Sequence, residues 1–557
     1  MKRTPILSLL AACLLLLASC KDANKSGLFI PKDAAFVFHI NTSSLSSKLS
    51  WEEIKNTTWY KDAYLEASKD SFAQKLMDNP DASGIDTKSD FVFFLKKRGR
   101  GGFSVFQGSI KDATAFEALV KKTSRQDKTE KDGEWNMVTA DNSTVVTWNN
   151  SKFAVINDMP MGDFNPMSGG NNEKARFGAD SLKLFVKQVM SIKGDQSLFD
   201  DKRFASTMKE NGDMHFWMNA GSLYSDMAGM MSMMKFSSLF EGNATAGTIH
   251  FDDGKITAKM KQYYGEEMKK AMEKWKFKNI DAAVLNRIPS QDIIGVMAMN
   301  IDPQGLSAFV KTMGLDGFAN MFLSQQDLTM DEILSATKGE FVMALTDLQM
   351  KDTTISFSTG DESKPFSYTT RKPDMSFMVA TSVNKKASFD KLLNIFKKDS
   401  AEVPFSYQLN NEWFVAGNKP AAVNAFVSGK QTNHPFTDKI TGHPFGMYID
   451  IQRLLKTDFS NDVTAKSLLA ESAAVWKDFI AVGDGFKNGE STSEITINMV
   501  DGKTNSLKQL NKYFEKLNAA RKANKMAMEK DENLMPLDSS AIDAITPPPP
   551  AEEMEKQ

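Results

Sequence analysis

The chain has 557 residues, of which 41% are hydrophobic and 25% are charged, and its mean hydropathy is −0.36. These values are typical of a globular protein and exclude a fibrous, a largely disordered or a multispanning membrane protein. The 68 Lys and Arg residues face 70 Asp and Glu residues, which gives a net charge of −2. Because the chain lacks the excess of positive charge that is typical of nucleic-acid-binding proteins, we expect no nucleic-acid partner.

Residues 1–19 are typical of a secretory signal peptide. Lys2 and Arg3 supply positive charge, and the apolar stretch 6–18 is shorter than the roughly 20 residues of a membrane-spanning helix. The stretch ends in Leu17-Ala18-Ser19-Cys20, which resembles the bacterial lipobox. The resemblance implies that Cys20 is lipidated and becomes the first residue of the mature protein. We therefore expect attachment to a membrane through acyl chains on Cys20.

Cys13 and Cys20 are the only cysteines. Because Cys13 lies in the signal peptide and Cys20 carries the lipid, the mature chain has no thiol for a disulfide, a zinc-thiolate site or cysteine catalysis. Residues 20–27 form a short polar tether, and residues 519–557, which are rich in Lys, Glu and Pro, are expected to be disordered. The expected location is the bacterial cell envelope, as an outer-membrane lipoprotein that faces either the periplasm or the outside.

Six segments of the first half of the chain recur in the same order in the second half. Each pair contains an apolar, strand-like run, and the spacing between the runs varies while their order is kept. We therefore expect two tandem homologous repeats, residues 28–278 and residues 279–518. The six pairs are 30–41 with 288–300, 90–95 with 340–345, 103–122 with 377–397, 152–157 with 413–418, 215–219 with 446–450, and 249–255 with 497–503.

The patterns within each repeat predict an α+β fold. Apolar residues at helical spacing follow a strand-like run at 116–120 and again at 389–396. Asp253-Gly254 and Asp501-Gly502 lie beside runs of alternating hydrophobicity, which is a strong hairpin signal. We expect each repeat to be a mainly antiparallel sheet that helices cover on one face.

Residues suited to catalysis are few and scattered. The five histidines, His39, His215, His250, His434 and His443, form no HxH or HExxH spacing, and we expect core or loop roles for them. The sequence has no GxSxG motif, and residues 502–504 resemble only the end of a P-loop. We therefore expect no enzymatic activity, no cofactor and no metal. An envelope hydrolase is an open alternative, with Asp252, Asp253 and Asp501 as candidate carboxylates.

Two local compositions suggest binding. Clustered thioethers suit a pliable wall for an apolar ligand or a Cu(I) site, although ordinary helix packing also explains them. The candidate ligand-binding residues are Met227, Met230, Met231, Met233 and Met234. Residues 98–102 alternate Arg with Gly, which is typical of a hairpin tip and also suits an anion site.

Together, the lipobox, the paired Ile-Pro openings at 30–31 and 288–289 and the proline-rich tail resemble uncharacterised lipoproteins of the Bacteroidota that are grouped as a domain of unknown function. This resemblance implies an envelope location and names no catalytic residue. We expect a lipid-anchored, non-catalytic binding or structural scaffold whose partner is an envelope protein, a polymer or an apolar ligand. A carrier of a lipid or other apolar ligand is the first alternative. A cleft between the two repeats is the expected binding place.

Overall fold

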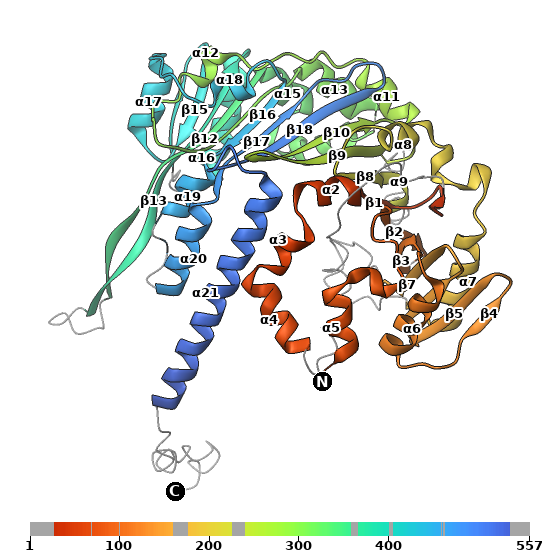
Figure 1. Cartoon of the computed structure of the whole chain (residues 1–557). Helices are drawn as coiled ribbons and strands as arrows, with labels where there is room; N and C mark the ends of the chain where they lie inside the picture. The colour runs from red at the N-terminus through yellow and green to blue at the C-terminus, as the bar shows by residue number, and fades with distance from the viewer. Residues whose placement is uncertain are drawn as a thin grey trace, which may run out of the picture.

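The computed structural model describes residues 27–67, 70–99, 101–159, 176–224, 240–312, 314–357, 366–399, 405–457, 459 and 463–534. The predicted lipid site at Cys20 lies outside these residues, and so do Met227, Met230, Met231, Met233 and Met234. The described chain is an α+β fold in which many helices pack on one large sheet (Figure 1). None of the described helices is both long and apolar enough to cross a membrane.

The described strands belong to one sheet of 18 strands. They are β1 Phe36–Ile40, β2 Phe91–Arg98, β3 Gly101–Ser109, β4 Glu130–Asp132, β5 Trp135–Asp141, β6 Thr144–Trp148, β7 Lys152–Asp158, β8 Met214–Asn219, β9 Ala244–Asp252, β10 Lys255–Tyr263, β11 Ile293–Asn300, β12 Thr337–Phe357, β13 Phe366–Val383, β14 Ser406–Leu409, β15 Trp413–Gly417, β16 Phe445–Ile449, β17 Trp476–Gly483 and β18 Glu490–Met499.

The helices vary from single turns to the long α21. They are α2 Thr42–Lys48, α3 Trp51–Lys55, α4 Thr58–Glu66, α5 Ser71–Asp78, α6 Ala113–Ser124, α7 Ala179–Met190, α8 Lys202–Thr207, α9 Ala220–Leu223, α11 Glu266–Met272, α12 Ala282–Leu285, α13 Pro303–Thr312, α14 Asp316–Leu323, α15 Met330–Ala336, α16 Lys386–Asp399, α17 Pro420–Ser428, α18 Thr437–Ile440, α19 Ile451–Lys456, α20 Val463–Ala473 and α21 Ser506–Leu534.

Every pair of neighbouring strands is antiparallel. The order across the sheet is β4-β5-β6-β7-β3-β2-β1-β8-β9-β10-β18-β17-β16-β11-β12-β13-β15-β14. Strand β10 pairs with β18 from Lys255 opposite Asn498 to Tyr263 opposite Glu490. The expectation of a separate sheet in each half is therefore wrong, because this contact joins the strands of both halves into one sheet.

The sheet buries side chains on both of its faces. We call one face the α18 face, where α7, α8, α12, α17 and α18 pack on buried side chains such as Val92 and Val296. The opposite face is the α21 face, where α2 and α6 pack on Phe91 and Phe153 and the start of α21 joins them through Leu507. The prediction that helices cover only one face is wrong, since apolar residues alternate toward both faces of β2 and neighbouring strands.

Local signals account for several element boundaries. The stripe 116–120 is buried in α6, whose start is capped by the Asp112 carboxylate. Asp253-Gly254 forms the predicted two-residue turn between β9 and β10. Asp501-Gly502 forms no hairpin, because Asp501 accepts hydrogen bonds from the backbone of Lys503 and Thr504 and the chain then enters α21.

Candidate functional site

The α21 face carries apolar side chains that are only half-buried in the second half of the chain. Strands β11 and β12 illustrate this asymmetry. On the α18 face, four of their apolar side chains are at most 2% exposed: Val296, Ala298, Val342 and Ala344. Their neighbours on the α21 face, including Met297 and Met343, are half-buried although they are also apolar.

These half-buried side chains form rows that cross the strands, because residues opposite each other in neighbouring strands lie on the same face. One such row, taken from β13 to β9, is called the Met297 row: Val379, Met343, Met297, Met447, Ala481, Ile495, Ala258 and Ile249. A parallel row contains Leu345, Gly295, Ile449, Phe479, Ile497, Ile256 and Phe251.

The helices of the second half do not bury these rows as the helices of the first half bury the core of the α21 face. In the first half, the core of the α21 face contains Phe91, Phe116, Trp148 and Phe153. In the second half, the buried cluster around α16 is small and is centred on Phe389. Helices α15 and α16 pack together and α15 contacts β12, whereas α19, α20 and α21 pack together and α19 contacts β17 and β11.

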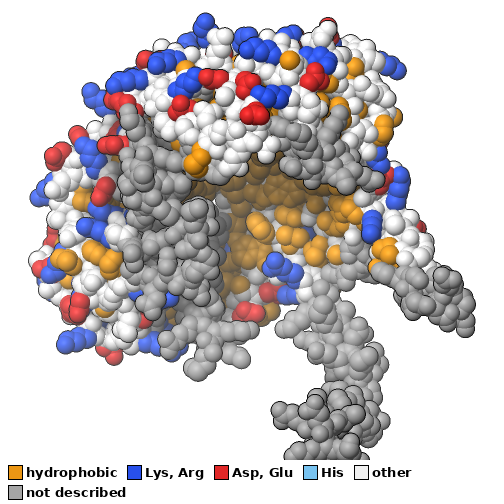
Figure 2. Space-filling model, turned by 180° about the vertical axis from the view of Figure 1, so that it is seen from behind, with side chains coloured by type: hydrophobic (Ala, Val, Ile, Leu, Met, Phe, Trp, Pro, Cys, Tyr) orange, Lys and Arg blue, Asp and Glu red, His pale blue; other side chains and the backbone are white. Residues whose placement is uncertain are grey.

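Figure 2 shows the result as a hollow in the molecule whose walls are densely covered by hydrophobic side chains. The Met297 row crosses eight strands, so its seven steps of about 4.8 Å span roughly 34 Å. This length is comparable with the roughly 30 Å of a bilayer's hydrocarbon core. Contiguous apolar surface that is only half-buried is typical of binding sites.

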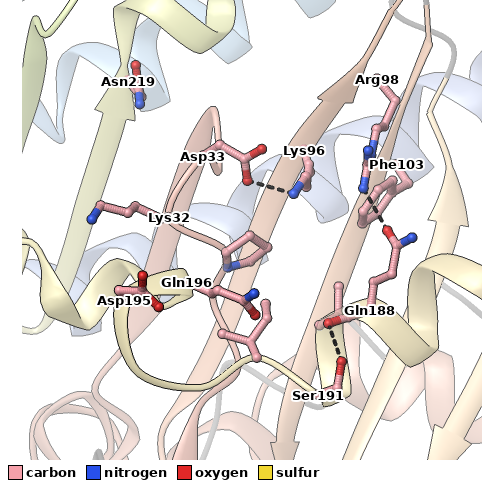
Figure 3. Close-up of a pocket in the computed structure, with 13 residues that line it drawn as sticks. Lys32, Asp33, Lys96, Arg98, Phe103, Gln188, Ser191, Asp195, Gln196 and Asn219 are labelled. Atoms are coloured by element: carbon pink, nitrogen blue, oxygen red, sulfur yellow. Dashed lines mark hydrogen bonds and ion pairs between the residues drawn. The ribbon is translucent and has the colours of Figure 1, made fainter.

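A second, polar pocket lies on the α18 face near the ends of β2 and β3 (Figure 3). Its volume is about 600 Å³. Lys96 and Arg98 project into it from β2, Phe103 of β3 lies beside them, and Gln188 of α7 accepts a hydrogen bond of 2.6 Å from Arg98 Nη2. Arg98 of the predicted anion loop therefore lies in a pocket, whereas Arg100 falls outside the described residues.

A third, open groove of about 610 Å³ lies on the α18 face across β10 and β18, where the two halves meet. Lys255, Lys259 and Glu494 line it, and so does His443, whose Nδ1 lies 2.8 Å from the Asp484 carboxylate. This is the position of the cleft expected between the repeats. Its lining mixes charged and hydroxyl groups with apolar side chains such as Met260, Ile480 and Val482, so the groove has no uniform polarity.

The three candidate carboxylates of a hydrolase line neither the pocket at β2 and β3 nor the groove across β10 and β18. Asp252 is 46% exposed and lies 4.0 Å from Lys48 Nζ. Asp253 belongs to the turn between β9 and β10. The hydrogen bond from the Thr504 side chain, and then those from the backbone of Lys503 and Thr504, lower the pKa of Asp501. Among the described residues, no group of three or more His, Cys, Asp or Glu is arranged to hold a metal ion.

The histidines occupy core and rim positions. His39 and His215 are at most 1% exposed and lie with their Nδ1 atoms 3.1 Å apart. His39 Nε2 is 2.9 Å from the Asp90 carboxylate, and His215 Nε2 donates to the carbonyl of Glu210 at 2.9 Å. His434 lies in an irregular segment before α18, and it is buried there instead of facing solvent. This burial lowers its pKa.

The residues of the Met297 row are not among the binding residues predicted from the sequence. Its signal lies in β11 and β12, whose runs Ile293–Met299 and Phe341–Leu345 are apolar at both odd and even positions. An antiparallel strand with one solvated face alternates apolar with polar residues, so a continuous apolar run indicates that both faces contact apolar groups.

No curated protein matches this chain. Two solved structures, described as crystal forms IV and I of TP0453, align with it at 12% and 10% identity. Each alignment covers 43% of this chain and 83% or 81% of the other, with TM-scores of 0.23 and 0.24.

A family model described as "Domain of unknown function (DUF4836)" matches residues 28–371. The match begins with the residues before β1 and extends into β13, so it includes all of the first half. Since the matched residues are more than half of the chain, the protein belongs to the DUF4836 family.

Proposed function

We propose that this protein is a non-catalytic binding protein whose hollow holds an elongated apolar ligand, such as the acyl chain of a lipid. The observation that carries the proposal is the Met297 row, which is apolar and half-buried across eight strands. Methionine side chains are unbranched and adaptable, so a wall that contains Met297, Met343 and Met447 suits flexible chains of differing length.

The length of the Met297 row favours an acyl chain over a compact ligand. One leaflet of a bilayer is about 15 Å of hydrocarbon, so an acyl chain would occupy about half of the Met297 row. At about 0.8 kcal/mol for each buried methylene, even partial burial of such a chain gives measurable affinity.

A fluorescent fatty acid tests the proposal. The full chain carrying Cys20→Ser, which removes the protein's own predicted acyl chains, should bind dansyl-undecanoic acid and should co-purify with lipid visible by native mass spectrometry. Met297→Lys should weaken dye binding about tenfold or more, because it places a charge in the row. Ala481→Phe should weaken it by occupying the same space without adding a polar group.

The matched control is Leu184→Lys, which makes a comparable change on α7 at a side chain that is 54% exposed. This variant should bind the dye as the parent does. If Met297→Lys and Ala481→Phe both fold and bind the dye as tightly as the control, the hollow is not the site.

A structural scaffold is the second candidate, and the ribbon formed by the outer parts of β12 and β13 favours it. Beyond Gln349 these two strands pair only with each other, and Figure 1 shows them extending away from the sheet. An isolated two-stranded ribbon is marginally stable, so a partner would add to its stability. Replacing residues 350–373 by a short turn should leave dye binding unchanged and should abolish capture of such a partner.

We further propose that the chain contains two tandem homologous copies. The support is the order of the strands outward from the central pair: β10, β9, β8, β1, β2, β3, β7, β6 on one side and β18, β17, β16, β11, β12, β13, β15, β14 on the other. These eight positions match one to one, and the first side continues with β5 and β4, which have no counterpart among the described strands of the second side. The predicted pairing of residues 249–255 with 497–503 differs from this order, in which β9 corresponds to β17.

The envelope location is also a proposal, and it depends on Cys20. The sequence Leu17-Ala18-Ser19-Cys20 supports an outer-membrane lipoprotein of the Bacteroidota type, facing the periplasm or the outside. Labelled palmitate should attach to the parent chain and not to the Cys20→Ser variant. Equal labelling of both chains would contradict this assignment.

A further inference from the structure

We propose that the pocket in Figure 3 binds a small, hydroxyl-rich molecule that carries a phosphate or carboxylate group. The pocket is on the α18 face, and the proposal is independent of the apolar hollow on the opposite face. It rests on three features of the described residues: a fixed guanidinium, a nearly buried ammonium and a rim of hydrogen-bonding groups.

Arg98 is the anchor for the anionic group. Its Nη2 donates to Gln188 Oε1 at 2.6 Å, and its Cζ lies 5.5 Å from the centre of the Phe185 ring. Both contacts orient the guanidinium without neutralising its charge, because Gln188 is an amide and Phe185 is a ring. Within the described part of the chain, Arg98 forms no ion pair, so its remaining N–H groups are available to an oxyanion.

Lys96 reinforces this positive end of the pocket. It lies two residues before Arg98 on β2, so both side chains project from the same face. The Lys96 side chain is only 13% exposed, and its ammonium contacts the Asp33 carboxylate at 2.6 Å. Since Asp33 is 65% exposed, an incoming oxyanion can share the ammonium without burying a carboxylate.

The rest of the lining favours hydroxyl groups. Gln196 and Ser191 present an amide and a hydroxyl, and the carboxylate of Asp195 accepts hydrogen bonds (Figure 3). A carboxylate repels a bare anion but binds the O–H groups of a polyol, which explains why acidic and basic residues share one pocket. The volume of about 600 Å³ lies within the usual range for small-molecule sites.

Calorimetry with glucose 6-phosphate, inorganic phosphate and glucose tests the proposal on the full Cys20→Ser chain. We expect glucose 6-phosphate to bind more tightly than either of the other two. Arg98→Gln should weaken its binding about tenfold or more, since it removes charge-assisted hydrogen bonds, and Arg98→Lys should restore part of the loss. The control Lys372→Gln removes an exposed positive charge from β13, outside the pocket, and should not change binding.

Two results would overturn the proposal. One is equal binding of glucose 6-phosphate by the Arg98→Gln variant and the parent, with both folded by circular dichroism. The other is binding to phosphatidylglycerol vesicles without binding to glucose 6-phosphate, which would assign the basic residues to a membrane surface.

Discussion

At the scale of single residues, the most informative group is the buried chain from Asp90 through His39 and His215 to the carbonyl of Glu210. The Glu210 carbonyl only accepts, so His215 Nε2 carries a proton. The contact between the two Nδ1 atoms needs one more proton, and the contact with Asp90 needs a third. With these three protons, the Asp90 carboxyl and the two imidazoles together have no net charge. This is true whether the proton between Asp90 and His39 is on the carboxyl or on the ring.

We therefore expect Asp90→Asn to destabilise the protein less than Asp90→Ala. The Asn amide can donate to His39 Nε2 and keep all three contacts, so we expect a loss of less than about 1 kcal/mol in the free energy of unfolding. Asp90→Ala leaves His39 Nε2 without this partner and should cost about 1 to 3 kcal/mol. Urea unfolding at neutral pH measures both values, and equal losses would contradict this assignment of protons to the three contacts.

At the scale of elements, α21 links the two halves on the α21 face. Ser506 at its start is fully buried, and Tyr513 bonds Ser472 of α20 at 2.7 Å. On the other side, Lys508 reaches Glu53 of α3 at 2.7 Å. Glu53 also caps α3 by accepting from the backbone of Ser50 at 2.9 Å, so one carboxylate serves two helices.

Glu53 should make the docking of α21 sensitive to acid. The hydrogen bond from Lys508, and then the one from the Ser50 backbone, lower the pKa of Glu53 from 4.5 to about 2. A lowered pKa in the folded state stabilises the protein above pH 4.5, and this contribution is lost as the pH falls from 4.5 toward 2. Hydrogen exchange in α21 should therefore accelerate over this range, and less so in Glu53→Gln.

Two substitutions of Glu53 distinguish the contribution of the helix cap to stability from that of the ion pair. Gln also serves as the third residue of a capping box, so Glu53→Gln should lose only the exposed ion pair, a few tenths of a kcal/mol. Glu53→Ala loses the cap as well and should cost about 1 kcal/mol. Unfolding in urea at pH 7 compares them, and equal losses would show that the cap contributes nothing.

How much the sequence could predict depends on how local each signal is. The Asp253-Gly254 turn and the stripe 116–120 are encoded by a few neighbouring residues, and both are confirmed. The hollow is different, because Phe91–Leu95 and Phe341–Leu345 are equally apolar runs. On the α21 face, Phe91 is buried in the cluster that contains Phe116 of α6, whereas Phe341 is half-buried. Helices distant in sequence decide this difference.

At the scale of the whole molecule, the junction between the halves is a close backbone contact. The Gly254 amide donates to the Thr504 carbonyl at 2.9 Å, and Met499 donates to the Gly254 carbonyl at 2.8 Å. Gly254 has a φ of +67°, and a Cβ at this position would overlap the backbone of Gly502. Both the conformation and the contact therefore require glycine.

Gly254→Ala should destabilise the junction more than Gly133→Ala, its matched control. Gly133 has a φ of +59° and open space around it, so Ala there adds only backbone strain, about 1 kcal/mol. Gly254→Ala adds the overlap with Gly502 and should cost roughly 3 kcal/mol. Differential scanning calorimetry should resolve two transitions for Gly254→Ala where the parent has one, and identical thermograms would contradict the role of this contact.

The nine residue pairs between β10 and β18 also limit how the molecule can move. Two domains that are joined by a flexible linker can open by a hinge motion. Here such a motion would have to break the backbone hydrogen bonds between β10 and β18. The sheet therefore behaves mechanically as a single plate. Any conformational change that admits a ligand to the hollow must therefore come from the helices around its opening.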